Sequence, residues 1–163
     1  MISDNIEENK KVAVAVLLLP YVIAPGYVKN KAQKTYRASI SEVKDSFLLH
    51  VPEEQNVPAA VVERREKFCE YGRELQPYII VAGDIRCENP NYFCVIEDVW
   101  YKFGNILEAI DVLFKCFHVF CLKYPAESEI IWLAIQIAIY NIQTEYDRVT
   151  ASVSAALLVL GTN

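Results

Sequence analysis

The strongest hydrophobic pattern of the chain covers residues 105–142. After Asn105, apolar side chains recur every three or four positions, and Glu108 is placed to complete a capping box with Asn105. Pro125 interrupts the pattern, and from Ile130 onward nearly every position is apolar. The pattern predicts two consecutive helices, of which the first buries one face and the second is central to a core.

Four short runs rich in β-branched and aromatic residues precede these helices, at residues 46–51, 78–83, 92–96 and 99–103. A helix is expected between the first two runs because Asn56 can cap it and Pro58 suits its first turn. Strand, helix, strand in this order implies a right-handed crossover and a parallel pair. The last two runs are joined by Glu97-Asp98, which predicts a two-residue hairpin. The predicted fold is a small single-domain α/β sandwich of about four strands, with the two apolar C-terminal helices packed on the sheet.

The chain before this pattern is divided into a polar start, an apolar run and a basic loop. Residues 1–9 are expected to fray. Residues 10–19 could form a strand or a helix, and a helix that ends before Pro20 is the favoured interpretation. Pro20, Pro25 and Gly26 then open a loop that is expected to run to about Glu42, and loops of this length tend to be functional or disordered. We therefore assign residues 1–41 to an N-terminal segment and basic loop, and residues 42–163 to the α/β domain, within one structural domain overall.

Composition places the chain among globular proteins. Of its 163 residues, 53% are hydrophobic and 23% are charged, and the net charge of −5 argues against a wholly basic nucleic-acid binder. Five cysteines match no disulfide framework or zinc spacing, so reduced thiols in an intracellular compartment are expected. The two apolar runs, 12–19 and 130–142, are shorter than the roughly 20 residues that a membrane span requires, so no membrane association is predicted.

The predicted loop carries a cluster of cations without any acid. Its positive and aromatic side chains are Lys29, Lys31, Lys34 and Arg37, interleaved with Tyr27 and Tyr36. Cations beside stacking aromatics suit single-stranded nucleic acid, and four charges would give weak, salt-sensitive binding. The alternative is a solvated loop.

No arrangement of residues predicts a catalytic, cofactor or metal site. Cys116 and Cys121 flank His118, but on a helix the two thiols point about 140° apart, so they are interpreted as buried structural cysteines. His50 is interpreted as an outward-facing residue of a strand. Asp84, after the strongest strand, is the best single candidate for an active-site acid, although no phosphate-binding glycine motif accompanies it.

Two further polar positions have ordinary structural interpretations. Glu97 and Asp98 are adjacent acids in a predicted turn, where side chains usually face water rather than share a cavity. Gln136 lies one turn from Trp132 in the second apolar helix. A buried glutamine must find hydrogen-bond partners, so it bonds the sheet or a loop, or it marks an interface.

Several apolar runs occur in a distinctive order, namely residues 75–83, 114–117, 124–127 and 132–136, with 17–21 and 46–51 before them. Together they resemble a domain of uncharacterised animal proteins found in insects, cnidarians and fish. In fish some copies follow a sterile alpha motif region, and their abundance is similar to that of mobile-element genes. The resemblance implies a domain often appended to longer chains, which favours an interaction or assembly role. It implies no activity, cofactor or catalytic residue.

The sequence therefore predicts a non-enzymatic module that binds a protein partner or itself, since a helix that is apolar on every face must be covered. The alternative is a nucleic-acid-associated factor of mobile-element origin that uses residues 29–37. An enzyme working at the sheet edge beyond Asp84 is a third hypothesis.

Overall fold

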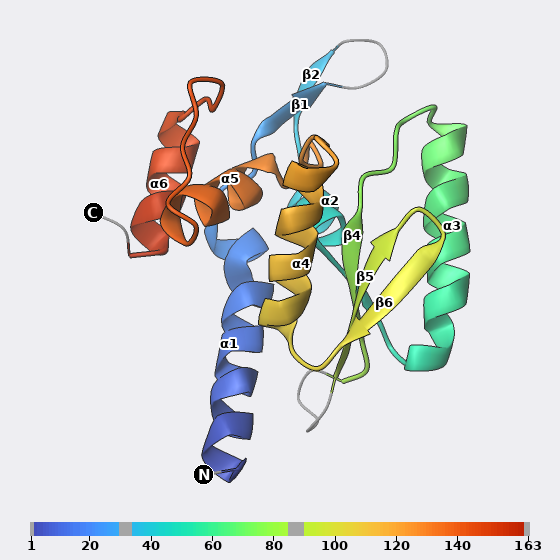
Figure 1. Ribbon diagram of the computed structural model, residues 1–163. Coiled ribbons are helices and arrows are strands. Elements are labelled where there is room, and N and C mark those ends of the chain that lie inside the picture. Colours follow the sequence, from blue (N-terminus) through green and yellow to red (C-terminus); the bar gives the residue numbers. More distant parts are fainter. Residues whose placement is uncertain (1, 30–33, 85–89, 162–163) are drawn as a thin grey trace. The chain divides into compact units, whose positions relative to one another are not determined.

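A computed structural model describes residues 2–29, 34–84 and 90–161 (Figure 1). The chain forms two compact units. The first comprises Met1–Leu17 and Leu48–Lys123, and the second comprises Leu18–Phe47 and Tyr124–Asn163. The fold is mixed α/β, which confirms the predicted class.

The first unit is built around a sheet with the strand order β3-β4-β5-β6. These strands are β3 (Leu48–Val51), β4 (Tyr78–Ala82), β5 (Asn91–Ile96) and β6 (Val99–Phe103). β3 and β4 pair in parallel, and helix α3 (Val57–Glu70), preceded by the short 3-10 helix η1 (Glu54–Asn56), connects them. The other pairs are antiparallel. The predicted strand-helix-strand unit and hairpin are therefore confirmed.

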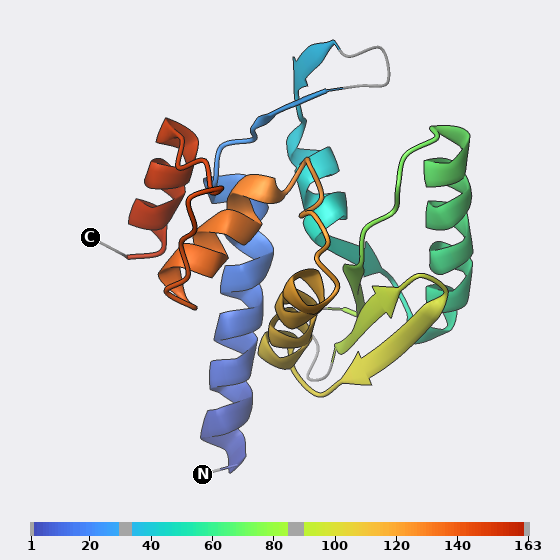
Figure 2. The same cartoon turned by 45° about the horizontal axis from the view of Figure 1, so that its top comes forward.

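The two faces of this sheet are covered by different helices (Figures 1 and 2). On one face, residues of β4 and β5 such as Ile80 and Phe93 form a core cluster with Val57 and Val61 of α3. On the other face lies helix α4 (Ile106–Val119), which contacts β4, β5 and β6. Burial on both faces explains why every residue of β4 is apolar and buried.

Helix α4 follows its sequence pattern closely. The Asn105 side chain accepts a hydrogen bond from the Glu108 backbone N–H at 2.9 Å, so the predicted N-cap is present. The side chains that α4 buries are Ile106, Ala109, Ile110, Leu113, Phe114 and Phe117. Their three-to-four spacing is what turns one helical face toward the sheet.

Helix α1 (Ile2–Val22) departs from its prediction in two ways. It begins near the N-terminus, where fraying was expected, and it continues through Pro20. A proline in the last turn removes a single N–H donor, and the next bond, from Ile23 N to Leu19 O at 2.9 Å, is kept. The prediction that the helix ends before Pro20 was therefore wrong.

The second unit contains the elements that the sequence suggested as a loop. Strands β1 (Tyr27–Lys29) and β2 (Thr35–Arg37) form an antiparallel pair, and helix α2 (Ile40–Phe47) follows. Ser39 and Glu42 form a capping box, with Ser39 N donating to a Glu42 carboxylate oxygen at 2.8 Å and Glu42 N donating to Ser39 Oγ at 3.2 Å. This box starts a helix where a loop was predicted, and α2 takes the first two residues of the predicted 46–51 strand.

The remaining helices of the second unit are α5 (Glu129–Ala138) and α6 (Ala151–Val159), which pack together. Trp132 of α5 is fully buried. Its ring meets Phe47 edge-on at a centroid distance of 5.2 Å and stacks on Tyr124 at 5.9 Å. Aromatic contacts of this kind stabilise beyond simple area burial, so α5 is the centre of this unit's core. No helix in the described part of the chain is long and apolar enough to cross a membrane.

Candidate interaction surfaces

The predicted basic loop is a β-hairpin whose two faces differ. The β1–β2 register sets Tyr27 opposite Arg37 and Lys29 opposite Thr35, so these four side chains share one face. All four residues are exposed, Tyr27 to 76%. Arg37 is held in place by a bond from its Nε to Pro25 O at 3.3 Å. The hairpin therefore presents one aromatic ring between two cations on a solvated face.

The other predicted nucleic-acid contacts are not all on that face. Tyr36 is opposite buried Val28, and its hydroxyl donates to Glu42 at 3.4 Å. Tyr36 thus points away from the cationic face. Lys34 precedes β2 and is exposed, and Lys31 lies outside the described residues. The sequence places both Tyr27 and Tyr36 near the cations. Only the strand register shows that Tyr27 shares their face of the hairpin and that Tyr36 does not.

The candidate catalytic residues are not brought together. Cys121 is exposed beyond the end of α4, in a left-handed conformation with φ of 52°, so its interpretation as a buried structural cysteine was wrong. Cys116 is half-buried and His118 is exposed. A ring nitrogen of His50 lies 2.9 Å from Gly83 O, a main-chain contact between β3 and the end of β4. Within the described ranges, no group of three or more His, Cys, Asp or Glu side chains could hold a metal ion.

The acids that follow strands face solvent. Asp84 is exposed after Gly83, whose φ of 105° is one that glycine adopts readily. Glu97 and Asp98 form the exposed turn between β5 and β6, and Asp98 pairs with Arg65 of α3. Glu97 is the first residue of this turn and has a φ of 55°. Both common two-residue hairpin turns require a positive φ at that position.

Strand β6 forms a surface that sequence reasoning missed. It is the last strand in the sheet order, so within the described chain no strand pairs with its outer edge. Three of its residues expose large apolar side chains, Val99 to 52%, Trp100 to 41% and Tyr101 to 51%. The run Val-Trp-Tyr-Lys-Phe contains one polar residue and no period-2 alternation, which was the available signal. We call the residues Val99–Phe103 with their outer backbone groups the β6 edge.

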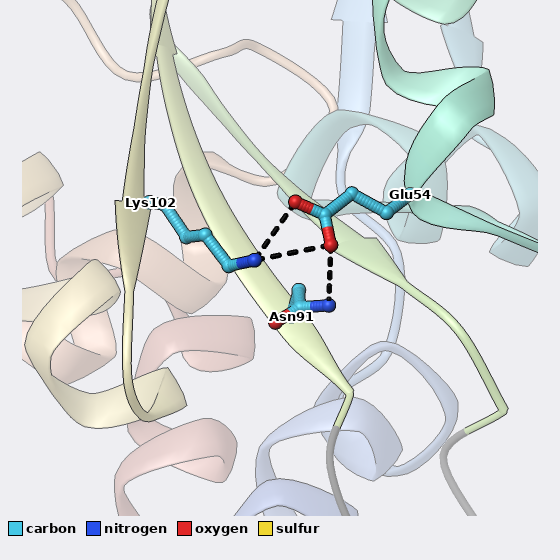
Figure 3. A network of polar contacts seen from close by, with 3 residues as sticks. All are labelled: Glu54, Asn91 and Lys102. Carbon is cyan, nitrogen blue, oxygen red and sulfur yellow. Dashed lines mark hydrogen bonds and ion pairs between the residues drawn. The ribbon is translucent and has the colours of Figure 1, made fainter.

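A polar network holds the side chain of Lys102, in the β6 edge, on the α3 side of the sheet (Figure 3). The Lys102 ammonium contacts both carboxylate oxygens of Glu54 in η1, at 2.8 and 3.0 Å. Asn91 of β5 donates to the same carboxylate at 2.8 Å. The Lys102 ammonium also lies 5.8 Å from the centroid of Phe93. The side chain of Lys102 is thereby held over its own sheet while its backbone stays at the outer edge.

Two buried groups in the first unit have strongly shifted acid–base behaviour. Burial raises the pKa of the Cys94 thiol to about 12, and its Sγ donates to Ala109 O at 3.0 Å. Burial also raises the pKa of Tyr78 to about 12, although the guanidinium of Arg64, 4.4 Å from its ring centroid, acts in the opposite direction. Both groups are neutral at physiological pH, which suits packing rather than nucleophilic chemistry.

Gln136 of α5 is a satisfied core residue. Its side-chain oxygen accepts a bond from the Tyr124 hydroxyl at 2.8 Å, and its nitrogen donates to Ile142 O at 3.2 Å and to the Asp147 carboxylate at 2.8 Å. These bonds attach the segment between α5 and α6 to the core of the second unit. Of the explanations left open by the sequence, bonding to a loop is therefore the observed one.

Comparison with known proteins supplies no relative for this chain. No family model, curated protein or solved structure matches it. The resemblance to a domain of animal proteins stays a prediction.

Proposed function

We propose that this protein is a non-enzymatic interaction module that binds a protein partner by strand addition at the β6 edge. The observation that carries the proposal is the exposure of Val99, Trp100 and Tyr101 on a strand that ends the sheet. Proteins usually protect such edges, because unpaired backbone groups beside apolar side chains template another strand. Recognition domains use the same geometry to bind extended peptides.

The turn before β6 indicates which backbone groups face a partner. A two-residue turn is closed by bonds between its flanking residues, here Ile96 and Val99, which the register pairs. Because bonded and non-bonded pairs alternate along an antiparallel ladder, the N–H and C=O of Tyr101 are directed toward β5. Those of Trp100 and Lys102 are directed outward. A partner strand therefore meets two residues with outward donors and acceptors.

Selection from a displayed library of extended peptides, followed by an N-methyl scan, tests this proposal. Peptides that bind by strand addition should lose binding when a methyl group replaces the amide hydrogens facing the edge. Methylation at the alternate amides should leave binding nearly unchanged, since those groups face away. Amide signals of Trp100 and Lys102 should shift on binding in a heteronuclear NMR spectrum.

Two variants of the protein provide a matched comparison. Trp100→Pro removes an outward donor as well as the indole, and edge strands tolerate proline at such positions. Trp100→Ala removes the indole alone. Proline should weaken peptide binding more than alanine does. Equal effects of the two variants, or selected peptides whose binding ignores the methylation pattern, would refute strand addition.

A second candidate function, nucleic-acid binding, is favoured by the hairpin face. Tyr27 lies between Lys29 and Arg37 on one solvated surface, which provides a stacking ring and phosphate contacts. The net charge of −5 limits the binding to a local, weak contact.

Filter binding of a single-stranded oligonucleotide at two salt concentrations tests this second candidate. Binding should fall as salt rises and should fall again in Tyr27→Ala and in Lys29→Ser. Tyr36→Phe is the control, because Tyr36 lies on the opposite face and should leave binding unchanged. Retention that ignores salt, or that survives Tyr27→Ala, would end this candidate.

A further inference from the structure

We propose that the strand which binds the β6 edge is β6 of a second copy, paired antiparallel about a two-fold axis at Tyr101. This inference rests on the proposed function and names its partner. Two four-stranded sheets would then join into one continuous sheet of two identical halves. Isologous pairing of this kind closes, so it produces a dimer rather than a fibre.

The register follows from backbone geometry and strand length. Outward groups belong to Trp100 and Lys102, so hydrogen-bonded pairs must join these residues across the interface. A two-fold axis at Tyr101 pairs Trp100 with Lys102 of the second copy, and Lys102 with Trp100. It is also the one centre that pairs all five residues of β6, because a shift toward Trp100 sets turn residues against the strand.

The side chains are complementary in the same register. Cross-strand neighbours lie on the same face of a sheet, so Trp100 is set beside Lys102 of the second copy, whose aliphatic part can pack on the indole while its ammonium stays on Glu54. On the α4 face, Tyr101 meets its own counterpart and Val99 meets Phe103 of the second copy. Each exposed apolar side chain of β6 would thus gain a cross-strand neighbour. No like charges are set directly opposite.

A parallel alignment of two β6 strands lacks these advantages. In a parallel ladder each outward residue bonds the two neighbours of the residue opposite it, so two copies that both direct Trp100 and Lys102 outward can pair only with a one-residue offset. Such an offset would also break the two-fold symmetry that most soluble dimers have. The directions of the outward backbone groups therefore select the antiparallel arrangement.

The inference is tested by placing charges at Tyr101, the residue on the two-fold axis. Sedimentation equilibrium over a dilution series of the full chain then measures the dissociation of the dimer. Tyr101→Lys and Tyr101→Glu each set two like charges opposite one another, so each variant alone should dissociate about tenfold or more readily. An equimolar mixture should recover a dimer, because lysine then faces glutamate. Tyr71, exposed to 52% against 51% for Tyr101, is the matched control, and Tyr71→Lys should dimerise as the wild type does.

A cross-link gives a second measurement that does not depend on charge. The axis pair is a non-hydrogen-bonded one, with a Cα separation of about 4.5 Å, which is within reach of a disulfide. Tyr101→Cys, in a background with Cys69, Cys87 and Cys121 replaced by serine, should form a covalent dimer with oxidised glutathione. Trp100→Cys should not, since its counterpart is Lys102.

The outcomes separate this inference from the proposed function. A wild-type chain that is monomeric at every concentration, while a selected peptide still binds at β6, overturns the second copy and leaves strand addition standing. Failure of both binding and dimerisation overturns both. A dimer that survives Tyr101→Lys, or a mixture that recovers nothing, shows that the copies meet elsewhere and also overturns the inference.

Discussion

Replacing Gln136 by methionine should destabilise the second unit measurably. Methionine has nearly the same shape as glutamine but makes none of its three side-chain bonds. The Tyr124 hydroxyl, Ile142 O and one contact of Asp147 would each lose a partner. Because Gln136 is 3% exposed, water has little access to replace them.

The expected magnitude follows from these contacts. A hydrogen bond contributes about 1 kcal/mol net, so three bonds amount to about 3 kcal/mol. Burial of the more apolar methionine side chain offsets this by about 1 kcal/mol. The free energy of unfolding should therefore fall by about 2 kcal/mol. Gln143→Met, at an exposed position, is the control and should change it by less than about 0.5 kcal/mol.

The chain offers a reporter that is confined to the second unit. Its two tryptophans are Trp100 and Trp132, and Trp132 is fully buried between Phe47 and Tyr124. In a Trp100→Phe background, fluorescence follows Trp132 alone. Urea titration of this reporter measures the stability of the unit that contains Gln136, even if the two units unfold separately.

A double-mutant cycle isolates the bond between Gln136 and Tyr124. Tyr124→Phe removes the hydroxyl that Gln136→Met would leave unpaired, so the two changes together should cost less than their sum by about 1 kcal/mol. A coupling energy indistinguishable from zero would refute the reasoning. So would a Gln136→Met variant that unfolds at the same urea concentration as its parent.

Three further predictions concern the first unit. Tyr78 has a buried hydroxyl without a hydrogen-bond partner among the described residues, so Tyr78→Phe should preserve or raise stability, by up to about 1 kcal/mol in thermal melts at neutral pH. Burial raises the pKa of Tyr78 from 10 to about 12, so the contribution of its neutral hydroxyl to the free energy of unfolding is fully present below pH 10 and is lost as pH rises toward 12. Tyr78→Phe should reduce this loss of stability in thermal melts at alkaline pH. Cys94 should resist alkylation in the native protein while exposed Cys69 reacts, which peptide mass spectrometry after maleimide treatment would check. Glu54→Gln should cost no more than about 1 kcal/mol in urea, and less in high salt, because the side chains of Glu54 and Lys102 are each about half exposed.

Local signals predicted the elements whose patterns were uninterrupted. The Asn105–Glu108 cap and the apolar stripe behind it located α4, and the continuous apolar run of β4 predicted a strand buried on both faces. The order of strand, helix and strand implied the parallel pair of β3 and β4. The cap and the apolar patterns are signals of residues close together in the chain, whereas the parallel pair follows from the order of three elements.

The errors occurred where a local rule was applied too strictly or overlooked. Pro20 was treated as a helix end, but in a last turn it removes only one bond. The Ser39–Glu42 capping box is present in the sequence and starts α2, but the prolines before it and the missing apolar period suggested a loop. Cys121 matched a helical stripe, but α4 ends before it and leaves it exposed.

The sequence by itself determined the α/β class, the parallel crossover and the two apolar helices, because hydrophobic period and capping are properties of adjacent residues. Only the tertiary structure decided which side chains share a surface. In the structure Tyr36 lies on the face of its hairpin opposite the cations, and Gln136 is hydrogen-bonded. The tertiary structure also left β6 at the end of the sheet. These outcomes depend on strand order, strand register and side-chain contacts across turns, none of which is contained in the hydrophobic period of a single segment.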